Sequence, residues 1–165
     1  MQKSLSEIVR VRHASVSRRL PDTLVVDIEE RIPAALWQNQ KKLSLIDREG
    51  VVLSSSNLTP YRALPLIVGA SAGAGVAEML ILLEAEPALG GNLAAATRIG
   101  GRRWDLRLKN GITVRLPETD AELALRRLMA AQEQSSLFER NIASIDLRQP
   151  GKMVIMPLTS SKEKI

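Results

Sequence analysis

The chain has 165 residues, and 45% of them are hydrophobic, which is enough to bury one sizeable core. Lysine and arginine outnumber aspartate and glutamate by 23 to 18, and the resulting net charge of +5 favours anionic partners. Only 2% of the residues are aromatic and none is cysteine, which disfavours a base-stacking nucleic-acid surface and excludes disulfides, thiol nucleophiles and cysteine-based metal sites.

Two short strands are predicted near the N-terminus. Residues 12–19 and 24–29 alternate between apolar and polar side chains, which is the period of half-buried strands. A turn at residues 20–23 joins them into a hairpin. Residues 5–11 fit the last turns of a helix, and residues 1–8 lack the apolar run of a signal peptide or membrane anchor.

A second hairpin is predicted around residues 47–50. Apolar runs over residues 43–46 and 51–53 flank this turn, whose Gly50 supplies a positive φ at little cost. Pro33 is expected to end the first hairpin, because proline cannot donate to a sheet ladder.

Residues 63–83 have the length and low charge of a membrane span, with Glu78 as their only charged residue. The run of glycine, alanine and serine at residues 69–75 disfavours a continuous helix. A proline and two glycines at residues 87–91 are expected to break the chain again. In this region we therefore expect a strand over residues 64–68, an amphipathic helix over 76–86 and a strand over 93–99.

The most detailed prediction concerns a hairpin over residues 104–116. A two-residue Asn-Gly loop at residues 110–111 would oppose Leu106 to Arg115, and one strand's apolar face would meet the other's polar face. A three-residue loop that begins at the preceding lysine pairs Leu106 with Val114 instead. Hydrophobic consistency selects the longer loop, with its glycine in the left-handed region.

One helix and two extended segments follow this hairpin. Residues 119–122, Thr-Asp-Ala-Glu, have the form of a capping box, and apolar residues recur at helical spacing as far as Ala131. The extended segments are predicted over residues 142–148 and 152–156, with a Gln-Pro-Gly turn between them.

No residue pattern indicates an enzyme, a cofactor site or a metal site. A catalytic centre brings a nucleophile, a base and an orienting group together, and the chain's single histidine, His13, lies on the polar face of a predicted strand. The glycine-rich residues 69–75 lack the Lys-Ser/Thr ending of a phosphate-binding loop. We therefore predict a small β-rich module that binds other proteins.

Basic residues form two clusters in the sequence. On an exposed strand edge, arginine either prevents edge-to-edge aggregation or docks an acidic partner, and the pattern is compatible with both. A basic β-rich module that binds nucleic acid or anionic lipid is the alternative function. The clusters are Arg10, Arg12, Arg18 and Arg19, and then Arg98, Arg102 and Arg103.

Seven short motifs, in the same order along the chain, resemble the FtsQ/DivIB family of bacterial cell-division proteins. Each motif is weak alone, but together they extend over nearly the whole chain. The motifs are VSRRLPDTL at residues 16–24, EERIPAALW at 29–37, IDREGVV at 46–52, LPLIVG at 64–69, RRWDLRL at 102–108, NG at 110–111 and IDLR at 145–148.

The resemblance implies an α+β fold in which part of a POTRA domain precedes an FtsQ-type β domain. Residues 1–34 would hold the POTRA domain's last helix end and final two strands. Residues 35–158 would form the β domain, a mostly antiparallel sheet with helices packed on it, and residues 159–165 a disordered tail. The family's cytoplasmic tail, transmembrane helix and first half of the POTRA domain are missing. We expect a fragment or a mis-started gene model rather than a degenerate relative, because the apolar face of the N-terminal hairpin requires cover.

The resemblance also implies a function. The chain would be a non-enzymatic scaffold of the division machinery, on the periplasmic side of the inner membrane, with no cofactor and no nucleic-acid partner. A partner, FtsB bound to FtsL, would add a strand to the C-terminal edge, and other division proteins would dock on the POTRA face. The partner-binding residues implied are Arg102 or Arg103, Arg148, and the edge residues Lys152, Met153, Val154, Ile155 and Met156.

Overall fold

The computed structural model describes residues 10–158, in which eleven strands form two sheets. One sheet has two strands, β1 and β2, and the other has nine strands in the order β11-β10-β9-β8-β7-β6-β3-β4-β5. The larger sheet is mixed, with more antiparallel than parallel neighbours. Of the helix end predicted over residues 5–11, the structure describes only the last two residues, and that part is wrong because Arg10 lies in a turn and Val11 begins a strand. The rest of this prediction and the tail predicted after residue 158 lie outside the described residues.

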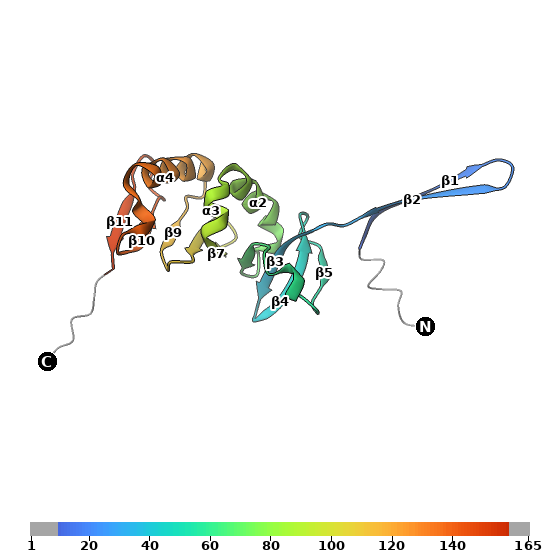
Figure 1. Ribbon diagram of the computed structural model, residues 1–165, viewed down its shortest axis with the longest axis horizontal. Coiled ribbons are helices and arrows are strands. Elements are labelled where there is room, and N and C mark those ends of the chain that lie inside the picture. The colour runs from blue at the N-terminus through green and yellow to red at the C-terminus, as the bar shows by residue number, and fades with distance from the viewer. Residues whose placement is uncertain (1–9, 159–165) are drawn as a thin grey trace.

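The predicted N-terminal hairpin is confirmed. Strands β1 (Val11–Arg19) and β2 (Thr23–Glu30) pair antiparallel, with Val16 opposite Val26. The hairpin extends away from the rest of the molecule (Figure 1), and these two valines are 67% and 55% exposed. Its predicted apolar face therefore exists but is uncovered among the described residues.

Ion pairs join the base of this hairpin to the turn between β4 and β5. Arg31 contacts Asp47 at 2.5 Å and Glu49 at 2.8 Å, and Arg12 contacts Glu49 at 2.8 Å. These hydrogen bonds from Arg31 and Arg12 lower the pKa of Glu49. Arg12, which belongs to the first basic cluster of the sequence, therefore forms ion pairs within the chain.

The next four strands confirm one hairpin and include one strand that was not predicted. The hairpin of β4 and β5 turns at Gly50, whose φ is +82°. Pro33 does not only end the first hairpin; it begins β3. Strand β3 lacks alternation because both of its faces are covered, with Ala35 in the main core and Leu36 in a second cluster. The strands are β3 (Pro33–Asn39), β4 (Lys42–Asp47), β5 (Val52–Ser54) and β6 (Leu66–Val68).

The hairpin predicted over residues 104–116 has the predicted register. Leu106 lies opposite Val114, the N–H of Leu108 donates to the carbonyl of Ile112 at 2.9 Å, and Gly111 has a φ of +92°. Strand β10 then joins β9 in parallel, and β11 pairs with β10 at the end of the sheet. The strands are β7 (Leu93–Ile99), β8 (Arg103–Leu108), β9 (Thr113–Arg115), β10 (Ile142–Asp146) and β11 (Val154–Pro157).

Three helices lie together on one side of the larger sheet (Figure 1). The predicted break at residues 87–91 is wrong, because Pro87 occupies the first turn of a helix, where its missing N–H is not needed. The predicted capping box is also wrong, because the N-cap Asp120 has a φ of +58° and makes no side-chain cap bond. The helices are α2 (Val76–Ala85), α3 (Pro87–Asn92) and α4 (Ala121–Ser135), with 3-10 turns at Thr59–Tyr61, Gly73–Gly75 and Leu137–Glu139.

Residues 63–83 divide into strand β6, a turn and helix α2, as predicted. In the part of the chain that the structure describes, no helix has the length and apolar character needed to cross a bilayer.

Two apolar clusters cover different parts of the larger sheet. The main core lies between the sheet and the helices and includes Trp104, Leu106, Val114, Leu128 and Ile145. The second cluster covers the opposite face only at the end formed by β3 to β6, where its buried members are Leu36, Leu45 and Leu53. The outer face of β8, β9 and β10 therefore carries polar side chains and has no helix over it.

Candidate partner-binding edge

Strand β11 is an open edge of the sheet. It pairs with β10 on one side, with Val154 opposite Asp146 and Ile155 opposite Ile145, and has no neighbour among the described residues on the other. Its Val154, Ile155 and Met156 are 46%, 42% and 52% exposed. Because side chains alternate along a strand, both faces of this edge present apolar groups to solvent.

The direction of the backbone groups in β11 follows from its neighbours. Leu147 donates its N–H to Arg115 of β9, so the N–H groups of Asp146 and Ser144 point the other way, toward β11. Leu158 donates to Asn141, which places the even-numbered N–H groups of β11 toward β10. The N–H of Ile155 therefore points out of the sheet, where an added strand would lie.

The other two predicted edge residues lie just before β11. Lys152 is exposed in the turn after β10, and its N–H donates to the carbonyl of Gln149 at 3.1 Å. Met153 is half-buried and packs against the main core. Of these two residues, Met153 therefore anchors the start of the edge strand, and Lys152 is exposed to solvent.

A row of alternating charges crosses the outer face of the sheet beside this edge. The strand register places Asp146 of β10 opposite Arg115 of β9, and Arg115 opposite Asp105 of β8. The row ends at Val154 of β11. These side chains lie on the face opposite the buried row of Ile145, Val114 and Leu106.

Arg148 and Arg103 extend this row on the same face. The Arg148 guanidinium donates hydrogen bonds to the Asp146 carboxylate, and its Nε lies 2.9 Å from Oδ1 and 3.0 Å from Oδ2. The Nε of Arg103 lies 3.6 Å from Oδ1 of Asp105, too far for a hydrogen bond. Asp105 also raises the pKa of Arg148, after the larger effect of Asp146, so the two ends of the row interact.

The structure distinguishes Arg102 from Arg103, the two arginines of the RRWDLRL motif that were alternative partner-binding residues. Arg102 precedes β8, is 72% exposed at its side chain, and has Glu118 as its ion-pair partner at 4.0 Å. Arg103 belongs to β8 and lies on the face that carries Arg148. The geometry therefore favours Arg103 as the companion of Arg148.

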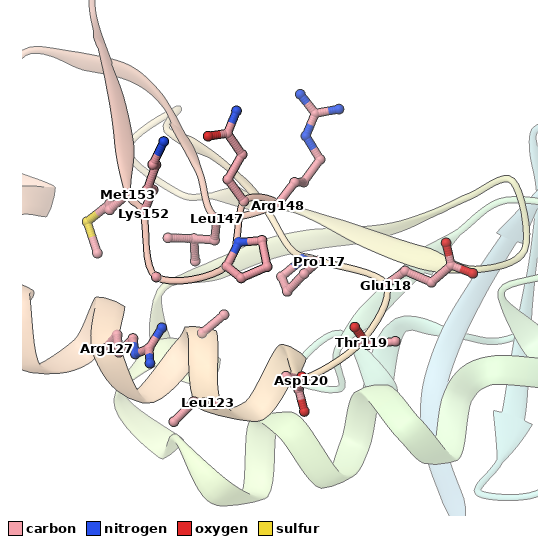
Figure 2. Close-up of a pocket in the computed structure, with 14 residues that line it drawn as sticks. Pro117, Glu118, Thr119, Asp120, Leu123, Arg127, Leu147, Arg148, Lys152 and Met153 are labelled. Carbon is pink, nitrogen blue, oxygen red and sulfur yellow. The ribbon is translucent and has the colours of Figure 1, made fainter.

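A groove of about 450 Å³ lies beside the turn that leads into β11 (Figure 2). Arg148 and Lys152 point away from α4 on one side, while Asp120 and Leu123 project from α4 on the other. The groove joins the start of the edge strand at Met153. Its lining combines Pro117, Leu123, Leu147 and Met153 with Arg127, Arg148 and Lys152.

Comparison with known proteins decides the family. Residues 35–148 match the family model of the C-terminal part of the cell division protein FtsQ/DivIB, and residues 1–31 match that of the FtsQ-type POTRA domain. The chain belongs to the FtsQ/DivIB family. The family is one of cell division proteins, and the fold of this chain is a POTRA element followed by the FtsQ-type C-terminal domain.

Relatives from several bacteria agree with the family assignment. The chain is 44% identical to the cell division protein FtsQ of Zymomonas mobilis over 142 residues, which are 86% of this chain and 45% of the relative. It is 37% identical to FtsQ of Caulobacter vibrioides over 147 residues, 89% of this chain and 49% of the relative. It is 39% identical to FtsQ of Rickettsia felis over 145 residues, which are 88% of this chain and 54% of the relative. The chain thus spans about half the length of these curated relatives.

A solved structure is also similar. It is the major extracytoplasmic domain of the cell division protein DivIB from Geobacillus stearothermophilus. The match covers 65% of this chain and 98% of that one, at 18% identity and a TM-score of 0.45.

The charge row contains residues that sequence reasoning missed. Asp105 and Asp146 stand inside two of the family motifs, but the motifs do not indicate that they lie in one row. Arg115, which lies between them, is outside every motif. The parallel pairing of β9 with β10 brings them together, and a helix of fifteen residues separates these strands in the sequence.

Stability should depend on pH through Asp146. Hydrogen bonds from Arg148 lower the pKa of this carboxyl in the folded chain. A lowered pKa means that the ionised carboxylate stabilises the fold above its unfolded pKa of about 3.9, and that this contribution is lost as the pH falls through the folded value. We expect Asp146→Asn to lower the free energy of unfolding at pH 6, and the difference from wild type to shrink as the pH falls below the unfolded value of about 3.9.

Urea unfolding at a series of pH values measures this difference. Glu133→Gln, an exposed carboxylate on α4 for which no ion pair is found among the described residues, is the control and should show no such pH-dependent difference. An Asp146→Asn difference that stays constant from pH 6 to pH 2.5 would contradict the assignment.

Proposed function

We propose that the chain is a non-catalytic part of the division scaffold that recruits FtsB, bound to FtsL, on the periplasmic side of the inner membrane. The observation that carries this proposal is the open edge of β11, whose exposed apolar side chains lie beside the arginine-bearing face. Recruitment occurs by strand addition: a segment of FtsB pairs with β11 and extends the sheet. Backbone hydrogen bonds supply affinity in this mode, and side-chain contacts supply specificity.

Acidic residues of the partner complete the interface at Arg103 and Arg148. Asp146 holds Arg148 in place, so little side-chain freedom is lost when a second carboxylate binds it. Arg103 makes only a loose contact with Asp105 and can form a new hydrogen-bonded pair. Arg102 contributes at most a solvated charge, because its side chain is largely exposed.

Nucleic acid or anionic lipid is the less well supported alternative. Phosphate-binding surfaces gather positive charge, whereas Asp105 and Asp146 interrupt the arginines of this face. The alternation suits a protein partner with matching charges of both signs.

A proline in β11 tests strand addition. Ile155→Pro removes the N–H that points out of the sheet, and we expect it to weaken binding of a purified FtsB–FtsL periplasmic complex roughly tenfold or more. Ile155→Ala is the matched control, because it keeps the N–H and loses only the side chain; its effect should be a few-fold. Binding is measured by isothermal titration calorimetry, and circular dichroism monitors the fold.

Two further variants show whether the edge itself is required. Val154→Pro and Met156→Pro remove N–H groups that point toward β10, so they should detach β11 and lose both binding and thermal stability. Unchanged binding by Ile155→Pro together with these variants would refute strand addition at β11. Loss of binding by Ile155→Ala to the same extent as by Ile155→Pro would point to side-chain packing instead.

A further inference from the structure

A groove on the helical side of the molecule carries the exposed apolar side chains of the helices. Among the described helices, two large apolar side chains are exposed, Ile81 of α2 at 52% and Leu123 of α4 at 49%. Both line one groove of about 680 Å³ between these neighbouring helices. Exposed apolar residues that gather in one hollow, and come from different helices, are typical of an interaction site.

Carboxylates surround these two side chains. Glu78, Glu118, Asp120 and Glu122 line the groove, and Arg126 is the only basic residue that does so. The chain as a whole carries a net charge of +5, so the groove is a local reversal of its charge. Charge complementarity therefore favours a positively charged occupant.

The carboxylates remain accessible although three of them have arginine partners. Glu78 pairs with Arg98 at 2.9 Å, Glu118 lies 4.0 Å from Arg102, and Glu122 pairs with Arg126, yet these three side chains are 45%, 57% and 48% exposed. Asp120 has no ion-pair partner in the described part of the chain, and in Figure 2 it points from the start of α4 in the same direction as Leu123. Each carboxylate can thus accept a further charged hydrogen bond.

We propose that this groove docks a basic amphipathic helix of a partner protein. The apolar stripe of the partner helix, with residues at i, i+3, i+4 and i+7, lies on Ile81 and Leu123, and its flanking lysines or arginines contact the carboxylates. Two packed helices form a groove that accepts the side-chain ridge of a third helix. Anionic lipid is disfavoured as an occupant, because the same carboxylates would repel its headgroups.

This site is separate from the β11 edge. It shares no residue with β11, although Glu118, Asp120 and Leu123 also line the groove beside the turn that leads into β11. The groove proposal does not depend on the identity of the edge partner.

A designed peptide tests the groove directly. The probe is a fluorescent helical peptide of three heptads, with leucine at the stripe positions and lysine elsewhere; a peptide with glutamate in place of lysine is its control. We expect the lysine peptide to bind the full chain and the glutamate peptide to bind at least tenfold more weakly, by fluorescence anisotropy at 0.15 M salt. Glu118→Lys/Glu122→Lys and Ile81→Ser/Leu123→Ser should each weaken the lysine peptide at least tenfold.

Matched variants separate this site from general charge attraction. Glu133→Lys/Glu139→Lys changes two exposed carboxylates outside the groove and should leave binding within twofold of wild type. Equal loss in this control, or equal binding by both peptides, would overturn the proposal. Sedimentation velocity tests whether a second copy of the chain occupies the groove instead. Self-association that Ile81→Ser/Leu123→Ser abolishes would assign the groove to that second copy and overturn the helix proposal.

Discussion

Trp104→Ala is expected to lower the free energy of unfolding by about 3–5 kcal/mol, the range for an aromatic side chain removed from a well-packed core. Trp104 is 1% exposed and is the largest of the fully buried side chains in the described residues. The Arg98 guanidinium lies 5.1 Å from the centre of its ring, and such a contact adds roughly 1 kcal/mol. The neighbouring strands of the sheet cannot move far enough to fill a cavity of this size, so most of the packing contacts of the indole ring are not replaced.

Trp104→Phe is the control for this prediction. The Nε1 of Trp104 has no hydrogen-bond partner in the part of the chain that the structure describes, so phenylalanine loses volume but no hydrogen bond. We expect its cost to be less than half that of alanine. Urea unfolding followed by far-ultraviolet circular dichroism measures both values. Equal costs for the two variants would contradict the prediction, because both lose the indole N–H and only alanine also loses the volume of an aromatic ring.

Gly50→Ala is expected to destabilise the fold by about 2–4 kcal/mol, through backbone strain and a steric clash together. Gly50 has a φ of +82°, in the left-handed region that side chains disfavour. A Cβ at this position would lie 2.4 Å from the carbonyl oxygen of Gly73, a backbone atom that cannot rotate away. The turn after β4 would have to move away from the loop before α2.

Gly151→Ala separates the two causes. Gly151 has a similar φ of +74°, but a Cβ there would meet no atom within 4 Å. Its substitution should therefore cost about 1 kcal/mol from strain alone. The difference between the two variants measures the clash with Gly73, and equal costs would show that this contact relaxes freely.

Local pattern was sufficient for the hairpins of this protein. Leu106 faces Val114 because a two-residue loop would set Leu106 opposite Arg115 instead, and this constraint depends on only a few neighbouring residues. The same holds for Gly50, where a turn residue between two apolar runs predicts a positive φ. Strand β3 escaped prediction because burial of Ala35 and Leu36 on opposite faces removes the alternation that marks a half-buried strand.

The predictions that failed depend on context beyond the local pattern. A proline and two glycines suggested a break, but packing of Leu89 into the core holds this segment as helix α3. Thr119 to Glu122 matched a capping box, yet the N-cap is Asp120, whose backbone is left-handed and whose side chain makes no cap hydrogen bond. Motif spacing does not contain the tertiary packing that decides these two cases.

The sequence by itself indicated the family, the register of the hairpin over residues 104–116 and the candidate residues at the C-terminal edge, because motifs and alternation are properties of contiguous residues. Only the tertiary structure decided which of these residues lie together. The parallel pairing of β9 with β10 aligns Asp146, Arg115 and Asp105, and it places Arg103 rather than Arg102 on the face of Arg148. The packing of α2 beside α4 brings Ile81 and Leu123 into one acidic groove. Long-range strand and helix pairing is set by burial of the whole core, and no local stretch of the chain encodes it.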